Sequence, residues 1–304
     1  MVGEEHAVPD LNEEYLLYQT LVGAWPMPRR VEDGFALDDA AREEFTRRIQ
    51  QYMIKAVNEA KVNMSWINPN QEYTEALNHF VAKILRPGTD AKPNSFLRLI
   101  TEFVPKIAFF GTINTLSQTL VKLTAPGVPD IYQGQELFDF SLVDPDNRRP
   151  VDFAIREEVL HQMSKDESGW AEHCTEMLRN WTDGRAKLWV TRKSLKARQE
   201  HRDIFDSGKY TSLRTSGAKA AHAIGYSRSI DDRTAVVLFP RFTHGLMNGE
   251  MRMPLGNVWG DTRITIPQGT YKNVFTGEGI SGGDVLCSEA LKTFPLMLLV
   301  PRNL

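Results

Sequence analysis

The sequence predicts an α+β protein in which helices come first and a small antiparallel β part follows. Through the first two thirds of the 304 residues, apolar side chains recur at steps of three and four, the period of a helix that packs on one face. From Tyr210 onward the pattern changes to short β-prone segments that Gly, Pro, Asp and Asn separate. The change falls near Ser207 and Gly208, so we expect one domain at 1–208 and a second at 209–304.

The helical part reads as a series of amphipathic segments. Asp38 can cap one that runs to about Lys61, and Phe45, Ile49 and Val57 lie on its apolar stripe. The interior Pro105 indicates a kink or a boundary in another. The expected helices span 13–25, 38–61, 72–85, 95–110, 112–123, 153–163, 169–179 and 185–202.

The β part reads as short strands at 221–227, 234–239, 263–266, 271–275 and 294–300. One more strand, 129–132, is expected inside the helical part. A single buried strand needs neighbours for its backbone donors and acceptors. Either its partner strands lie outside this chain or the segment is not a strand, and we favour the first alternative.

Composition excludes several classes of function. The chain is 41% hydrophobic and 25% charged with a net charge of −3, so no basic surface for nucleic acid is indicated. The N-terminus has no secretory signal and no apolar run is long enough for a bilayer, so we expect a cytoplasmic protein without membrane contact. The histidines are scattered and Cys174 and Cys287 lie far apart, so neither a metal nor a cofactor is expected. The GxGxxG match at 277–282 reads as a turn of the β part, not as a dinucleotide loop.

The strongest candidate site is the segment 124–152, in which a Pro/Gly entry and an apolar run open into a polar loop. Such a loop on a rigid scaffold is typical of a polar ligand site, whereas the alternative is a surface loop with self-compensating ion pairs. The candidate binding residues are Tyr132, Gln133, Asp144, Asp146, Asn147, Arg148 and Arg149.

The wording of this segment resembles a known family. Gly127, Pro129, Tyr132, Gly134 and Glu136 fill a G-x-P-x-x-Y-x-G-x-E pattern similar to the eighth-strand motif of the alpha-amylase family of glycoside hydrolases. The continuation LFDFSLVDPDNRRPVDF resembles the maltooligosyltrehalose synthase branch more specifically. Stretches at 12–26, 52–66 and 183–191 point to the same branch, so the resemblance covers almost the whole chain.

The resemblance implies a (β/α)8 barrel followed by a β-sandwich. This chain would then be the helical C-terminal part of the barrel, with its last strand, and the small antiparallel β-sandwich domain. The implied activity rearranges the reducing-end α-1,4 linkage of a maltooligosaccharide to α,α-1,1, an isomerase step in trehalose biosynthesis. The family's catalytic carboxylates lie on the fourth, fifth and seventh strands, which should precede Met1, so no residue here is assigned as catalytic.

Within this expectation the acceptor side of a sugar pocket is lined by Asp144, Asp146, Asn147, Arg148 and Arg149. The alternative is that the arginines only hold the loop to the rim of the barrel. Glu136 is expected to be a structural anchor. We expect a maltooligosaccharide substrate for the full-length enzyme and an inactive fragment whose exposed apolar helix faces could pair with another copy.

Two alternatives stay open: a non-catalytic carbohydrate-binding or assembly module, and a fragment of another alpha-amylase-family hydrolase. The few stacking aromatics of the β part argue against the first, and the stretch SLVDPDNRRPVD argues against the second.

Overall fold

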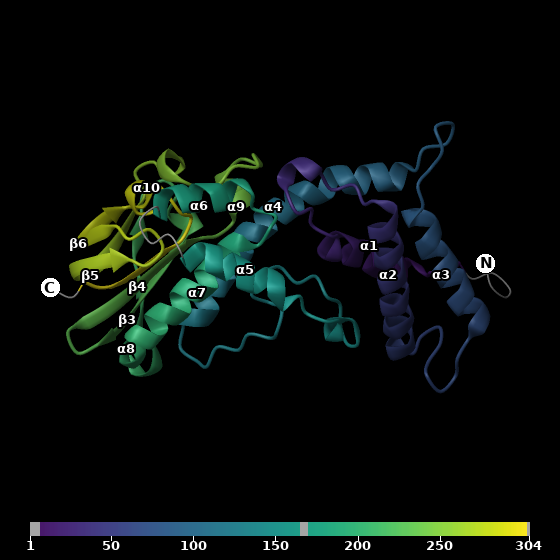
Figure 1. Ribbon diagram of the computed structural model, residues 1–304, viewed down its shortest axis with the longest axis horizontal. Coiled ribbons are helices and arrows are strands. Elements are labelled where there is room, and N and C mark those ends of the chain that lie inside the picture. Colours follow the sequence, from purple (N-terminus) through teal and green to yellow (C-terminus); the bar gives the residue numbers. More distant parts are fainter. Residues whose placement is uncertain (1–6, 165–169, 303–304) are drawn as a thin grey trace. The chain divides into compact units, whose positions relative to one another are not determined.

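The computed structural model describes residues 7–164 and 170–302, and in it helices precede strands, as the sequence predicts (Figure 1). Of the predicted helices, the one at 169–179 begins at a residue outside the described part. The main helices are α1 (Leu11–Ala24), α2 (Asp39–Ala60), α3 (Gln71–Leu85), α4 (Ser95–Thr124), α5 (Phe153–Ser164), α6 (Trp170–Arg179), α7 (Arg185–Glu200) and α8 (Arg202–Ser207).

Helix α2 begins where the sequence predicts it. The Asp38 carboxylate accepts a hydrogen bond from the Ala41 N–H at 2.8 Å and so satisfies one of the free donors of the first turn. The stripe that includes Phe45, Ile49 and Val57 is buried. It packs with helices α1 and α3, so the first helices form a small bundle.

Helix α4 corrects the prediction of two helices at 95–110 and 112–123. It is continuous from Ser95 to Thr124, with Pro105 inside it. A glycine inside a helix costs only about 1 kcal/mol relative to alanine, so Gly111 does not by itself end one. Buried Ile113 and Leu116 follow Gly111 directly, and their packing outweighs that cost. Conversely, the single helix expected at 185–202 divides at His201 into α7 and α8.

The seven strands of the described residues belong to one antiparallel sheet in the order β1-β3-β4-β7-β5-β2, with β6 paired to β5. The two strands predicted at 263–266 and 271–275 are one long strand with a register shift between Ile266 and Thr270. The GxGxxG match begins just after a turn at 274–276 and continues into β6, so it does not open a helix. The strands are β1 (Lys209–Leu213), β2 (Thr215–Ser216), β3 (Ala223–Ile230), β4 (Arg233–Pro240), β5 (Arg263–Asn273), β6 (Gly279–Leu286) and β7 (Met297–Pro301), with short helices α9 (Thr243–Leu246) and α10 (Cys287–Ala290) between them.

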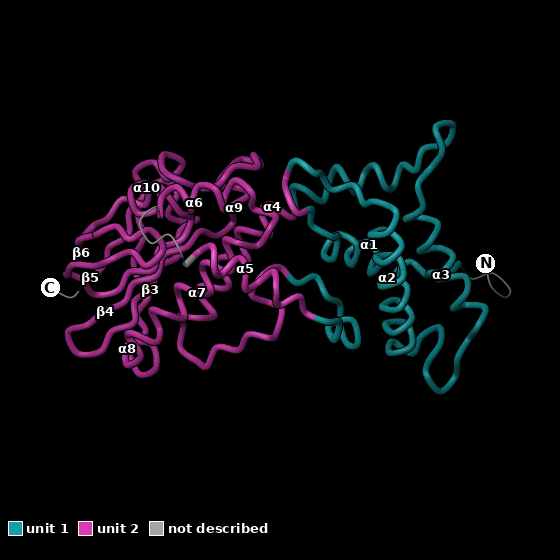
Figure 2. Tube along the Cα trace, in the orientation of Figure 1, with its two compact units in different colours: residues 1–28, 32–107, 139–150 teal, residues 29–31, 108–138, 151–304 magenta. Residues whose placement is uncertain are grey.

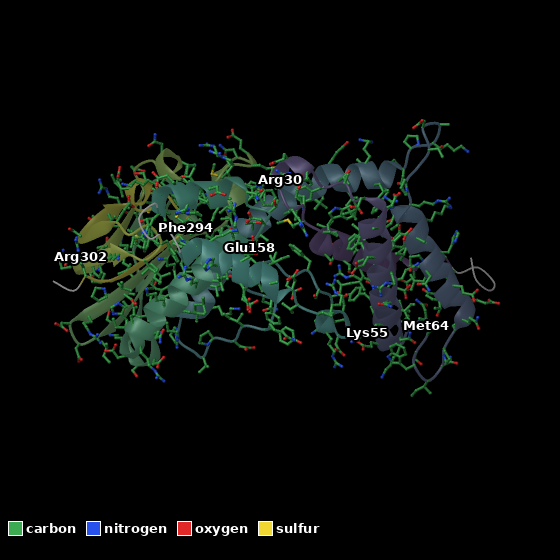
Figure 3. All side chains as sticks on the ribbon, viewed as in Figure 1. Arg30, Lys55, Met64, Glu158, Phe294 and Arg302 are labelled. Atoms are coloured by element: carbon green, nitrogen blue, oxygen red, sulfur yellow. The ribbon has the colours of Figure 1, made fainter. Side chains whose placement is uncertain are left out.

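One face of the sheet packs against helices α4, α6, α7 and α8. Ala235 and Val237 of β4 point to this face, and Val236 and Leu238 point to the other, because side chains alternate along a strand. Since all four are buried, β4 is covered on both faces. Members of the helix-side core come from the four helices, the strands and the loops between strands, including the labelled Phe294 (Figure 3): Leu116, Leu120, Cys174, Met177, Leu178, Ala186, Trp189, Val190, Ala197, Ile204, Phe205, Tyr226, Ala235, Val237, Phe275, Phe294, Leu296, Leu298 and Val300.

The sheet curls over its other face. In the strand order β3 and β5 are separated by β4 and β7, yet the side chain of Ile264 on β5 lies over Gly225 on β3. A Cβ added at Gly225 would lie 2.2 Å from Ile264 Cδ1, so the contact is close. The predicted combination of helices and an antiparallel sheet is thereby confirmed, whereas its finer description as barrel part and sandwich stays a prediction.

The structure corrects the prediction of a strand at 129–132. Residues 128–132 form no strand and lead into a turn at 133–136. In the helical part that the structure describes, the only bridge of β type is the isolated pair Thr89 and Lys92, so no strand is present to pair with 129–132. An extended segment without partners cannot form a ladder.

The chain divides into two compact units (Figure 2), which we describe separately. Unit 1 contains Met1–Pro28, Glu32–Ile107 and Asp139–Pro150, and unit 2 contains Arg29–Val31, Ala108–Phe138 and Val151–Leu304. The last of the main helices thus ends at Ser207, and the sheet shares one unit with helices α5–α8. Among the described residues, no helix combines the length and apolar character needed to cross a bilayer.

The curl of the sheet predicts that Gly225→Ala lowers the free energy of unfolding by about 1–3 kcal/mol, because the new methyl group meets Ile264. Ile264→Val removes Cδ1 and should recover part of this loss in the double variant. Urea titration measures both changes. Gly279→Ala is the matched control, because its nearest neighbour is the end of a flexible arginine side chain. Additive losses in the double variant would contradict the contact.

Candidate functional site

The candidate segment 124–152 divides between the two units at Phe138 and Asp139. Tyr132 and Gln133 belong to unit 2, and the other candidate residues, which run from Asp144 to Arg149, belong to unit 1. Each group is therefore described within its own unit.

In unit 2, Tyr132 and Gln133 lie at the start of a turn with exposed side chains. The turn closes when the Gln135 N–H donates to the Tyr132 carbonyl at 3.0 Å. Gly134 follows with φ 93°, a conformation that favours glycine. Among the described residues, neither the Tyr132 nor the Gln133 side chain has a hydrogen-bond partner, so both can meet a ligand.

The side chains of Glu136 and Arg156 fix this turn by hydrogen bonds to the backbone of Gly134. The Glu136 carboxylate accepts from the Gly134 N–H at 3.0 Å and pairs with Arg156 Nε at 3.2 Å. Arg156 also donates to the Gly134 carbonyl at 2.6 Å. These bonds give Glu136 the contacts of a structural anchor.

In unit 1, Asp146 is the centre of the loop. Arg48 of α2 forms a forked ion pair with it, with Nε to Oδ1 at 2.9 Å and Nη2 to Oδ2 at 2.8 Å. The Leu142 N–H donates to the same carboxylate at 2.7 Å, and Arg149 Nε lies 3.1 Å from Oδ1. The two side chains of the fork are 8% and 13% exposed, so the charges compensate each other out of water.

The electrostatics of Asp146 follow from this arrangement. Burial alone would raise the pKa of its carboxyl group, but the hydrogen bonds from Arg48 and Leu142 and the charges of Arg48 and Arg149 lower it below the ordinary value of 3.8. Asp146 is therefore an ionised acceptor with all of its strong contacts already made inside the protein.

The neighbours of Asp146 differ in how many of their polar groups are already bonded within the protein and in how exposed they are. Arg149 also donates to the Asp146 carbonyl and to Ser141 Oγ, so it closes the loop on itself. Arg148 pairs with Asp144, and these two side chains are 71% and 48% exposed. Asn147 Oδ1 is a buried acceptor without a hydrogen-bond partner among the described residues.

Sequence reasoning missed the groups that hold the loop. Arg48 supplies the fork and also donates to the Phe140 carbonyl at 2.7 Å. Lys55, labelled in Figure 3, donates to the Asp144 carbonyl at 2.5 Å. Both lie on α2, where Arg48 directly precedes Ile49 of the apolar stripe. A charged residue at the edge of such a stripe is the signal that could have been noticed.

The groups of the candidate segment are suited to binding by hydrogen bonds and charge. No cluster of three or more His, Cys, Asp or Glu side chains suited to a metal occurs in the described ranges. Burial raises the pKa of Cys174 and of Cys287 to about 12, which keeps both as unreactive thiols. The exposed amide, phenol, carboxylate and guanidinium groups of the segment are suited to polyhydroxylated ligands.

The fork predicts that Arg48→Met lowers the free energy of unfolding by on the order of 3 kcal/mol, because it leaves a buried carboxylate with half of its cationic partners. Denaturant titration measures the loss. Arg148→Met is the control: it breaks an exposed pair and should cost less than about 1 kcal/mol. Equal losses in the two variants would mean that the fork does not hold the loop.

The lowered pKa of Asp146 also predicts a pH dependence. A carboxyl group whose folded pKa lies below 3.8 stabilises the fold above that pH, and the contribution disappears as the pH falls through the folded value. Asp146→Asn should therefore be less stable than the wild type near neutral pH and approach it in acid. The free energy of unfolding of both proteins, measured from pH 7 down through the folded pKa of Asp146, tests this. A difference between the two proteins that stays constant with pH would refute it.

Comparison with known proteins gives the following relatives. No family model matches the chain. Two proteins from strains of Mycobacterium tuberculosis, each named "Putative maltooligosyl trehalose synthase", are 28% identical over 305 residues, which is 99% of this chain and 34% of theirs. The maltooligosyltrehalose synthase of Arthrobacter ramosus has a TM-score of 0.73 at 30% identity, over 95% of this chain and 32% of that one. A Sulfolobus tokodaii structure described as a hypothetical maltooligosyl trehalose synthase has a TM-score of 0.64 at 30% identity, over 95% and 32%.

The sequence and structure comparisons agree with each other. The chain spans about a third of the length of the curated relatives that it matches. The resemblance predicted from the sequence is thereby confirmed: over nearly its whole length, this chain is similar to a portion of maltooligosyltrehalose synthase.

Proposed function

We propose that this chain is the C-terminal portion of an enzyme that converts the reducing-end α-1,4 linkage of a maltooligosaccharide into an α,α-1,1 linkage. The observation that carries the proposal is the similarity over 99% of the chain to proteins named for this synthase. The catalytic carboxylates would come from polypeptide other than these residues, and the chain alone would be inactive.

The reaction sets requirements both for the catalytic carboxylates and for the pocket around the leaving sugar. A retaining glycosyl transfer uses two carboxylates about 5–5.5 Å apart, one as nucleophile and one as acid and base. Isomerisation adds that the released glucose stays beside the glycosyl-enzyme and turns, so that its anomeric hydroxyl attacks in place of water. This needs a closed pocket with hydrogen-bonding groups around the leaving sugar.

The candidate residues divide into two roles under this proposal. Arg148 and Asp144 are exposed, so these two are suited to sugar hydroxyls, whereas the unbonded acceptor of Asn147 is buried beside them. Tyr132 and Gln133 are suited in the same way within unit 2. Asp146 and Arg149 are occupied with loop contacts and would position the others.

The finer architecture belongs to the same proposal. Residues 1–208 would complete a (β/α)8 barrel, with 129–132 becoming its last strand when neighbouring strands are present, and 209–304 would be a β-sandwich domain. We also propose that the protein acts in the cytoplasm, and that exposed apolar helix residues such as Phe103 allow copies of the isolated chain to associate.

The test compares this chain with a longer protein that joins it to the remaining two thirds of a synthase. With maltopentaose, the longer protein should remove reducing ends without releasing an equivalent amount of glucose, and this chain should not. Arg148→Ala in the longer protein should raise glucose release relative to loss of reducing ends, because the leaving sugar is held less well. An unchanged product ratio would remove Arg148 from the pocket.

Other outcomes separate the alternatives. Conversion by this chain alone would overturn the placement of the catalytic groups elsewhere. Micromolar binding of maltopentaose by this chain, with no conversion by the longer protein, would favour a carbohydrate-binding module. Glucose release without α,α-1,1 product would favour a hydrolase of the alpha-amylase family.

A further inference from the structure

The end of helix α4 is capped by two arginine side chains that the proposed function has not used. The last carbonyls of an α-helix have no partner within the helix and carry partial negative charge. Arg198 of α7 donates to the Leu123 carbonyl at 3.3 Å, and Arg228 of β3 donates to the Thr124 carbonyl at 3.2 Å. Arg198 also donates to the Gly127 carbonyl at 3.3 Å, just beyond the helix.

Both guanidinium groups are themselves held in place. Arg228 is 2% exposed and donates to the Gly208 carbonyl at 3.0 Å, where the helices end and the sheet begins. Arg198 pairs with Asp206 at 2.9 Å, and this carboxylate offsets the repulsion between the two nearby cations. The cap is therefore built from α7, α8 and the sheet together.

A tyrosine completes the cap. The Thr124 hydroxyl donates its one hydrogen to the Leu120 carbonyl at 2.6 Å, so the Tyr226 hydroxyl, 2.6 Å away, is the donor in their contact. Burial raises the pKa of Tyr226 to about 12, which keeps this donor protonated at neutral pH. Thr124 is thus bonded at its carbonyl and at its side chain by neighbouring residues of one strand.

The segment that follows has few other supports. Within the described residues, 126–131 makes no backbone–backbone hydrogen bond to another part of the chain. The side chain of Val128 is 96% exposed. The next firm contacts are the bonds from Arg156 and Glu136 at Gly134. The path to Tyr132 and Gln133 is therefore defined by the cap at one end and by this anchor at the other.

We infer that Arg198 of α7 and Arg228 of β3 are positioning residues that set where residues 125–133 begin, and that α7 and the C-terminal sheet together place Tyr132 and Gln133. The link from placement to sugar binding rests on the proposed function. The placement itself does not, and it gives the β part a role in the site although none of its residues is proposed to touch the ligand.

The test is hydrogen–deuterium exchange of this chain in native buffer, for the wild type and for Arg198→Met. We expect peptides covering 119–125, where the backbone N–H groups of the last turn of α4 are bonded, to exchange at least about tenfold faster in the variant, while peptides from β3 and β4 keep their rates. Arg202→Met is the matched control, because Arg202 pairs with the same Asp206 but gives no bond to the end of α4. It should change neither set of peptides.

Further variants keep the test decisive if one of them fails to fold. Tyr226→Phe removes the donor to Thr124 without changing the shape of the core and should loosen the same peptides to a smaller extent. Arg198→Lys can bond only part of the set of carbonyls and should give an intermediate rate. Equal acceleration in 119–125 and in β3 and β4 would mean a merely structural role, and an unchanged rate in 119–125 would overturn the inference. Because the measurement needs no sugar, its failure is separate from a failure of the proposed function.

Discussion

Cationic side chains bond several backbone carbonyls of residues 124–152, and the structure of the candidate site depends on this bonding. The segment has one short 3-10 turn, η2 (Asp146–Arg148), and otherwise no regular structure that could pair its own carbonyls. In unit 1, Arg48 and Lys55 reach the loop from α2. In unit 2, Arg156 and Lys187 reach it from α5 and α7. Because helices supply the donors, the loop has a fixed backbone while several of its own side chains are left available for a ligand.

The local parts of the fold could be predicted from sequence. Asp38 and the stripe of α2 follow from capping and from period, which depend on residues within one helix. The division of α4 at Gly111 was wrong because a local helix breaker competes with packing that is not visible in one segment. Residues 129–132 form no strand in this structure for a related reason, since a strand depends on neighbours and the described helical part provides none.

The candidate site could be predicted only in part. The crowding of acids, amides and arginines identified the loop, but composition does not tell Asp146 from Asp144 or Arg149 from Arg148. Their difference comes from Arg48, which is 98 residues away in sequence from Asp146. Long-range pairing of this kind decides which side chain is buried and bonded within the protein and which is exposed. A single sequence carries no direct signal of such a pair.

The sequence distance between Arg48 and Asp146 has a consequence for the order of folding during synthesis. The helices α1, α2 and α3 can form and pack as soon as they leave the ribosome, because their contacts are close along the chain. Until residues 140–146 have been added, Arg48 lacks its partner Asp146 and Lys55 lacks the Asp144 carbonyl, although Lys55 can already pair with Glu59 of the same helix. Unit 1 is therefore completed late although most of its residues come early, and until that point its surface is more polar than the one it has in the finished protein.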